Sequence, residues 1–245
     1  MKASLFITCL ADVFFPAVGR SVVDVLEAHG VDVDFPAAQT CCGQPAYNSG
    51  YHKDARKAAK QMIQAFADSE RVVTPSGSCA SMIRHYYPSL FADEPDWQAR
   101  AEALADKTYE FSEFLVRVLG VTEVAATYAP DTVATYHSSC HMARGLGIKD
   151  DPQQLLQGVG GLELKDLPHC QDCCGFGGTF AAKMSDISRE MIDEKIKHVE
   201  STGASLLIGS DMGCLMNIGG RLQREGKHIA VRHVAEVLAE GRKRG

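Results

Sequence analysis

Two stretches of this sequence, CCGQPAYNSG at residues 41–50 and CCGFGGTF at residues 173–180, begin with the same three letters and lie at the centre of an internal repeat. One more cysteine precedes each pair, by 32 residues in one copy and 33 in the other, and another follows it after 37 and 40 residues. The full sets are Cys9, Cys41, Cys42 and Cys79 in the first half, and Cys140, Cys173, Cys174 and Cys214 in the second. Such a repeat predicts two units of similar fold.

Each repeat supplies four thiols from three separate segments, a pattern that indicates a metal site and that core packing does not require. Structural zinc usually takes cysteines that are spaced two residues apart, whereas the adjacent Cys41 and Cys42 are poorly suited to bind one small tetrahedral ion together. Neighbouring thiolates can bind different irons of one cluster, and a following glycine lets the backbone approach it. We therefore predict iron-sulfur sites, with zinc binding and thiol redox chemistry as the alternatives. The expected cofactor-binding glycines are Gly43, Gly175, Gly177 and Gly178.

Hydrophobic runs in both halves alternate between strand and helix patterns. Residues 3–8 and 132–136 are typical of strands, and each run ends close to the first cysteine of its repeat. Residues 185–201 have a helical pattern. Because ligand sites in open parallel sheets lie beyond the carboxyl ends of the strands, we expect the four cysteines of each half to converge. Around a shared cluster, their sulfurs should lie within roughly 6 to 7 Å of one another.

The predicted fold class is α/β, with two pseudo-symmetric Rossmann-like α/β units that contain parallel sheets and are joined by a helical connector. The first unit spans residues 1–120, including the acidic connector at residues 91–120. The second unit spans residues 121–245, and its tail from residue 228 to residue 241 is typical of a strand and a helix. The basic residues 242–244 are interpreted as a solvated helix end.

The composition excludes several classes of protein. The 245 residues are 45% hydrophobic and carry a net charge of −6, which argues against nucleic acid as a partner because phosphate binding needs a basic face. No apolar run reaches transmembrane length, and the run 3–11 stops at Asp12 without a clear signal-peptide cleavage site. We expect a cytoplasmic protein. Nine is an odd number of cysteines and the cytoplasm would keep them reduced, so a disulfide framework is the weaker account.

The two CCG stretches resemble the duplicated cysteine-rich "CCG" domain that occurs in heterodisulfide reductase and in the iron-sulfur subunit of glycolate oxidase. The chain length, PSGSC at residues 75–79 and GGRLQREG at residues 219–226 are similar to the lactate utilization protein A family. The full heterodisulfide-type motif ends in C-x2-C, but Met82 and Asn217 stand where that last cysteine would be. Four cysteines per half suit one 4Fe-4S cluster per repeat.

By this resemblance, the chain is an iron-sulfur electron-transfer subunit of a multi-subunit system that oxidises L-lactate to pyruvate. Its implied partners are a ferredoxin-like iron-sulfur subunit and a third subunit of a lactate utilization complex. The sequence contains no dinucleotide fingerprint, P-loop or nucleophile elbow, so we expect a redox subunit and not a complete enzyme, and no catalytic residue is assigned. The alternatives are a thiol/disulfide oxidoreductase that uses the vicinal cysteines and a structural zinc-binding assembly module.

Three residues beside the second cysteine set have open roles. Cys170 is the ninth cysteine and has no counterpart in the first repeat, so a ligand, a resolving thiol and no role at all are its alternatives. His137 and His141 flank Cys140. For these histidines we favour a structural role or a hydrogen bond near the site, and direct ligation is the alternative.

Overall fold

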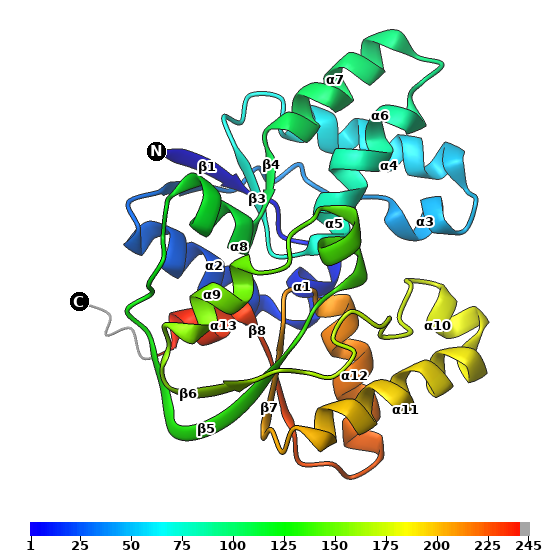
Figure 1. Cartoon of the computed structure of the whole chain (residues 1–245). Coiled ribbons are helices and arrows are strands. Elements are labelled where there is room, and N and C mark those ends of the chain that lie inside the picture. Colours follow the sequence, from blue (N-terminus) through cyan, green and yellow to red (C-terminus); the bar gives the residue numbers. More distant parts are fainter. Residues whose placement is uncertain (241–245) are drawn as a thin grey trace.

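The computed structural model describes residues 1–240 and contains two four-stranded parallel sheets, one from each half of the chain (Figure 1). Their strand orders are β2-β1-β3-β4 and β6-β5-β7-β8, so every strand of one sheet has a counterpart in the other. The predicted α/β class with two pseudo-symmetric units is thereby confirmed. The division of the chain at residues 120 and 121 stays a prediction, and the basic residues 242–244 lie outside the described residues.

The first half follows the predicted alternation of strands and helices with one exception. Its strands are β1 (Lys2–Leu5), β2 (Asp32–Asp34), β3 (Val72–Thr74) and β4 (Thr108–Glu110). Its longer helices are α1 (Cys9–Phe14), α2 (Pro16–Ala28), α4 (His52–Ala65) and α7 (Pro95–Asp106). Its shorter helices are α3 (Gln44–Asn48), α5 (Gly77–Ser81), η1 (Met82–Tyr86), α6 (Tyr87–Leu90), α8 (Phe111–Glu113) and η2 (Phe114–Val118). The exception is β4, which lies within the predicted helical connector and completes the first sheet. The sequence did not predict this strand, because three residues are too few to show an alternating pattern.

The second half repeats this order. Its strands are β5 (Thr127–His137), β6 (Gly160–Lys165), β7 (Leu206–Gly209) and β8 (Ala230–His233). Its helices are η3 (His141–Gly145), α9 (Asp151–Gln157), α10 (Phe180–Lys183), α11 (Ser185–Ser201), α12 (Met212–Arg224) and α13 (Val234–Ala239). The predicted helix at residues 185–201 has the bounds of α11, and the predicted strand and helix of the tail are β8 and α13. Within residues 1–240, every helix falls short of the length and apolar character that crossing a membrane requires.

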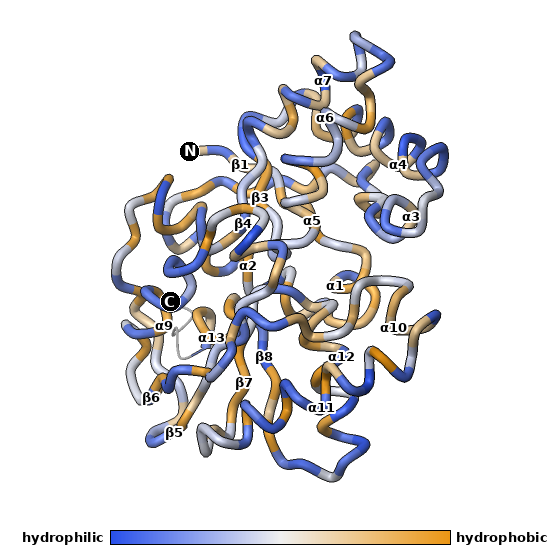
Figure 2. The backbone as a smooth tube through the Cα atoms, turned by 45° about the vertical axis from the view of Figure 1, so that its right-hand side comes forward, coloured by the Kyte–Doolittle hydropathy of each residue, from blue (hydrophilic) through white to orange (hydrophobic). Residues whose placement is uncertain are grey.

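The largest hydrophobic core is shared between the two halves. It includes Leu5 and Val73 of the first sheet together with Ala134 and Leu206 of the second. Helix α13 packs against α2 and α9, and Figure 1 shows these helices grouped between the two sheets. Figure 2 shows hydrophobic residues along β7 and many hydrophilic ones along the outer helix α11. Because burial of apolar surface is the main stabilising term, the two halves stabilise each other.

A buried carboxylate joins the two helices that follow β3 and β7. The amide of Ser78 at 2.9 Å and the hydroxyl of Ser76 at 3.0 Å donate to Oδ2 of Asp211. The amide of Gly213 donates to Oδ1 of the same side chain at 3.1 Å, so Asp211 caps α12 and also holds the start of α5. The third residue of each of these helices is a cysteine of the repeat. Asp211 therefore fixes one cysteine segment from each half relative to the other.

Candidate metal centres

The first cysteine set gathers beyond the carboxyl ends of β1, β2 and β3. Cys9 begins α1, Cys41 and Cys42 precede α3, and Cys79 lies in α5. The Sγ atom of Cys9 is 3.7 Å from that of Cys41, and the Sγ atom of Cys42 is 3.4 Å from that of Cys79. Cys41 and Cys42 are adjacent in the sequence and so connect the two pairs. The structure thus brings together all four predicted residues of this half.

The second set has the same arrangement at the ends of β5, β6 and β7. The Sγ atoms of Cys174 and Cys214 are 2.9 Å apart. Cys140 and Cys174 both lie close enough to Cys173 to lower the pKa of its thiol, so these four residues are also together. The shortest contacts in both sets are below the roughly 6 to 7 Å expected across a four-iron cluster, so binding such a cluster requires these pairs to separate. All nine cysteines are free thiols.

A glycine in a left-handed conformation follows each cysteine pair and directs its amide at a sulfur. Gly43 has φ = 82° and its N atom lies 3.5 Å from Sγ of Cys41, while Gly175 has φ = 77° and its N atom lies 3.4 Å from Sγ of Cys173. A Cβ atom at residue 175 would come within 2.7 Å of the Ser188 carbonyl oxygen, so only glycine fits this turn. Amide donors near the sulfurs are what an iron-sulfur site needs.

The two turns also meet each other across the halves. The hydroxyl groups of Ser49 and Thr179 are 2.7 Å apart. Gly178 faces Pro45, and Gly177 packs closely against Phe180. These two glycines therefore shape the contact between the turns, and their assignment as cofactor-binding residues stays a prediction.

Hydrogen bonds between the thiols favour one thiolate in each set. Those from Cys42 and Cys9 lower the pKa of Cys41 well below its ordinary range. Hydrogen bonds from Cys140 and Cys174 lower the pKa of Cys173 in the same way. Each set therefore holds a negative charge between other sulfur donors, which is the donor chemistry of a site for iron or another thiophilic metal.

The surroundings of the first set are apolar. Phe6 and Met62 are fully buried in one cluster with Cys42. Met82, which stands where the missing fifth cysteine would be, is fully buried in the same cluster. The hydroxyl of Tyr87 donates to the carbonyl oxygen of Cys42 at 2.8 Å and so holds the turn in place.

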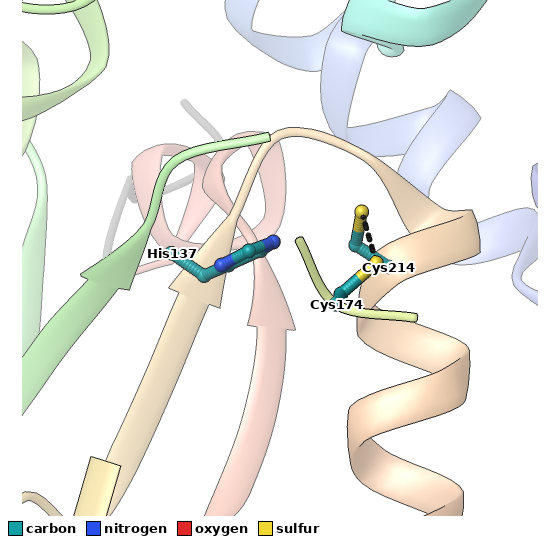
Figure 3. A group of neighbouring side chains, drawn as sticks. All are labelled: His137, Cys174 and Cys214. Atoms are coloured by element: carbon teal, nitrogen blue, oxygen red, sulfur yellow. Dashed lines mark hydrogen bonds between the residues drawn. The ribbon is translucent and has the colours of Figure 1, made fainter. Parts of the chain in front are cut away.

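The second set also borders an apolar cluster, but the buried polar side chains of His137 and Lys195 lie beside it. The His137 side chain lies at the end of β5 with its residue only 1% exposed, and Figure 3 shows its ring directed at Cys174 and Cys214. A ring nitrogen and these two sulfurs all lie within 4.8 Å of one another. Burial, together with the nearby charge of Lys195, lowers the pKa of His137 to about 4, so the ring is neutral at pH 7. The sequence singled out this histidine but not its grouping with these two cysteines.

Lys195 and Asn217 support the segments around the second set. The ammonium group of Lys195 is buried and donates to the carbonyl oxygens of His169 at 2.6 Å and Cys170 at 3.3 Å. The side-chain amide of Asn217 donates to the carbonyl oxygen of Cys174 at 3.0 Å. Sequence reasoning missed Lys195, although a charged residue on the apolar face of a helical pattern is an available signal.

Two residues with open roles lie at the margin of this site. Cys170 packs against the apolar cluster that contains Cys174. Ring atom Nδ1 of His141 lies 3.7 Å from the Sγ atom of Cys140. The roles of Cys170 and His141 therefore stay open.

Comparison with known proteins agrees with the repeat. Residues 3–84 and 134–219 each match the model of the CCG cysteine-rich domain. Lactate utilization protein A 2 of a Bacillus cereus strain is 64% identical over 241 residues, which cover 98% of this chain and 99% of that protein. Lactate utilization protein A of Halalkalibacterium halodurans is 60% identical over 238 residues, which cover 97% of this chain and 96% of that protein. The crystal structure of a hypothetical protein from Helicobacter pylori aligns with a TM-score of 0.63 at 12% identity, over 99% of this chain and 49% of that one, a likeness of fold alone.

Proposed function

Because the chain belongs to the lactate utilization protein A family and carries the CCG cysteine-rich domain twice, we propose that it serves lactate utilization as an electron-transfer subunit with one iron-sulfur cluster in each half. The observation that carries this proposal is the grouping of four thiols from three segments at equivalent sheet ends. When bound, such clusters would supply one-electron transfer. The proposed ligands are Cys9, Cys41, Cys42 and Cys79 in the first half, and Cys140, Cys173, Cys174 and Cys214 in the second.

The burial of the cysteines suits electron transfer. Cys42 and Cys79 are buried whereas Cys9 is exposed, and in the second half Cys174 and Cys214 are buried. Buried cysteines keep water away from one side of each site. The exposed Cys9 in the first set, and the half-buried Cys140 and Cys173 in the second, give a partner protein access to the other side. The amides of the glycines that follow the pairs would stabilise the negative charge of the sulfurs.

We also propose partners and a compartment. An electron-transfer subunit needs a donor and an acceptor, for which we propose a ferredoxin-like iron-sulfur subunit and a third subunit of an L-lactate oxidising complex. Nine free thiols suit a reducing compartment, so we place the chain in the cytoplasm. The chain alone is not expected to oxidise L-lactate to pyruvate, because hydroxy-acid oxidation needs a flavin or nicotinamide cofactor that its sequence motifs do not indicate.

The test is metal and sulfide analysis of the full chain purified without oxygen, followed by reduction with dithionite. We expect iron and acid-labile sulfide in equal amounts, about four of each per half, and reversible bleaching of a brown colour. The Cys170→Ser variant is the matched control, because it removes a cysteine that lies outside both sets and should keep all the iron. Zinc in place of iron would instead identify the assembly module, and turnover of L-lactate at the full rate by the isolated chain would contradict the subunit role.

The contact between two buried thiols favours a second candidate, a thiol/disulfide oxidoreductase. Sγ of Cys174 lies 2.9 Å from Sγ of Cys214, closer than the sulfurs of either thiol pair in the first set, and oxidation of this pair to a disulfide needs little movement. This candidate predicts stoichiometric thiol oxidation by a disulfide substrate in protein that contains no iron. Protein that contains iron when it is isolated, and whose thiols react only after this iron has been removed, would argue against it.

A further inference from the structure

The imidazole ring of His137 is buried without a hydrogen-bonding partner. Its residue is 1% exposed, and among residues 1–240 neither Nδ1 nor Nε2 has a hydrogen-bond partner. Lys195 and Asp211 are the charged side chains that act electrostatically on His137, and both have other hydrogen-bond partners. Lys195 donates to two backbone carbonyls, and Asp211 accepts from the starts of α5 and α12. Because a buried polar group without a partner is destabilising, its presence indicates an interaction that the protein side chains do not supply.

The fold itself does not need a histidine at this place. Phe6 and His137 each precede the first cysteine of their repeat by three residues. The strand registers agree, because Leu5 pairs with Val73 in the first sheet as Tyr136 pairs with Ile208 in the second. In the first half the phenyl ring fills the space with no polar atom to satisfy. A histidine is thus an addition specific to the second half.

The ring is placed as a metal ligand would be. A ring nitrogen and the Sγ atoms of Cys174 and Cys214 lie within 4.8 Å of one another, and the ring extends from the end of β5 toward the two sulfurs (Figure 3). Nitrogen and sulfur bonded to one ion at about 2.0 and 2.3 Å lie up to about 4.3 Å apart, so small side-chain movements suffice.

We propose that a ring nitrogen of His137 is a ligand of the metal centre in the second half, beside Cys174 and Cys214. This proposal rests on the proposed function, because it assumes that the second half binds iron. It makes the two centres chemically different, with sulfur ligands alone in the first and an added nitrogen ligand in the second. The cation of Lys195, which interacts electrostatically with Cys174 and Cys214, favours the more negative reduced form, so we expect the second centre to be the easier to reduce.

The test is pulsed electron paramagnetic resonance of the reduced centre in protein labelled with 15N-histidine. The Cys42→Ser variant should retain only the second centre and should show the strong coupling of a directly bound imidazole nitrogen. The Cys174→Ser variant should retain only the first centre and should show no such coupling. Adding His137→Phe to Cys42→Ser should abolish the coupling, whereas adding His141→Phe, the matched control at the other flanking histidine, should leave it intact.

The outcomes separate this inference from the function on which it rests. An iron-loaded second centre without strong nitrogen coupling overturns the ligation by His137 and leaves the electron-transfer proposal standing. Weak coupling alone, as from a hydrogen bond to a sulfur, also overturns it. Protein that binds no iron in either half overturns both proposals. Since the labelled Cys42→Ser protein carries the native His137, its spectrum decides the matter even where His137→Phe fails to fold.

Discussion

In the first half, Phe6 and Met62 lie in one apolar cluster with Cys42 and Cys79, whereas in the second half His137 and Lys195 occupy the equivalent places. Met62 and Lys195 correspond because each lies seven residues after the residue, Ala55 or Ser188, that packs under the glycine of the turn. The sulfurs keep the same grouping in both halves. The scaffold therefore fixes the sulfur positions, and the surrounding side chains are what can make the two centres chemically different.

A second difference follows the same repeat at the last strand of each sheet. Glu110 ends β4 and His233 ends β8, and each side chain caps the helix that follows in a capping box. Burial raises the pKa of Glu110 to about 8 and lowers the pKa of His233 to about 4. Both groups are therefore mainly neutral at pH 7, although one is an acid and the other a base.

The largest expected effect is loss of one centre at a time. Cys42→Ser should remove about half of the iron and leave the second centre occupied, and Cys174→Ser should do the reverse, because the ligands of the two halves are separate. Iron analysis of each variant after anaerobic reconstitution measures this. If either substitution empties both halves, the centres are not independent, and the shared core or Asp211 must couple them.

The next effect is on the pH dependence of stability. The folded pKa of Glu110, about 8, lies above its ordinary value of 4.5, so its neutral form contributes about 4 to 5 kcal/mol below pH 4.5, and this is lost as the pH rises through 8. The folded pKa of His233, about 4, lies below its ordinary value of 6.5, so its contribution of about 3 kcal/mol is present above pH 6.5 and is lost as the pH falls through 4.

Urea unfolding of the metal-free, reduced protein across pH 4 to 8 checks the expected pH dependence for both Glu110 and His233. Glu110→Gln should flatten the decline in stability on the alkaline side of the range. His233→Gln should reduce the decline on the acid side without abolishing it, because burial also lowers the pKa of His137 to about 4. Unchanged pH profiles for both variants would show that neither neutral cap stabilises its half.

A smaller effect on the free energy of unfolding is expected when Phe6 and His137, which are equivalent in the repeat, are each replaced by the other residue type. In metal-free protein, Phe6→His should lower the free energy of unfolding by about 2 to 4 kcal/mol, because it places unpaired polar atoms in an apolar cluster. His137→Phe should be neutral or should raise that free energy by up to about 2 kcal/mol, because it removes polar atoms without partners. Equal destabilisation by both exchanges would mean that His137 has a structural role in its own half.

Much of this comparison could be predicted from the sequence. The spacing of the cysteines indicated the repeat, and the strand patterns before Cys9 and Cys140 placed these residues at sheet ends. Parallel sheets collect the ends of their strands at one edge, so the grouping of the sulfurs followed from these two patterns. The role of the cysteines as ligands stays a prediction.

The features that could not be predicted depend on contacts between segments far apart in the sequence. The strand β4 has only three residues, so no periodic pattern marks it within the connector. The position of Asp211 against Ser76 and Ser78 depends on how the halves pack. The direction of the His137 ring depends on the register of β5 with β7, which sequence periodicity does not fix.

The central claim, two clusters on one repeated scaffold with different surroundings, is tested most directly by an anaerobic potentiometric titration followed by electron paramagnetic resonance. We predict two separate reduction steps, with the step at higher potential missing in Cys174→Ser and the step at lower potential missing in Cys42→Ser. The cation of Lys195 lies near Cys174 and Cys214 and favours the reduced second centre. A single step common to both halves, or a higher-potential step that disappears in Cys42→Ser, would contradict the account.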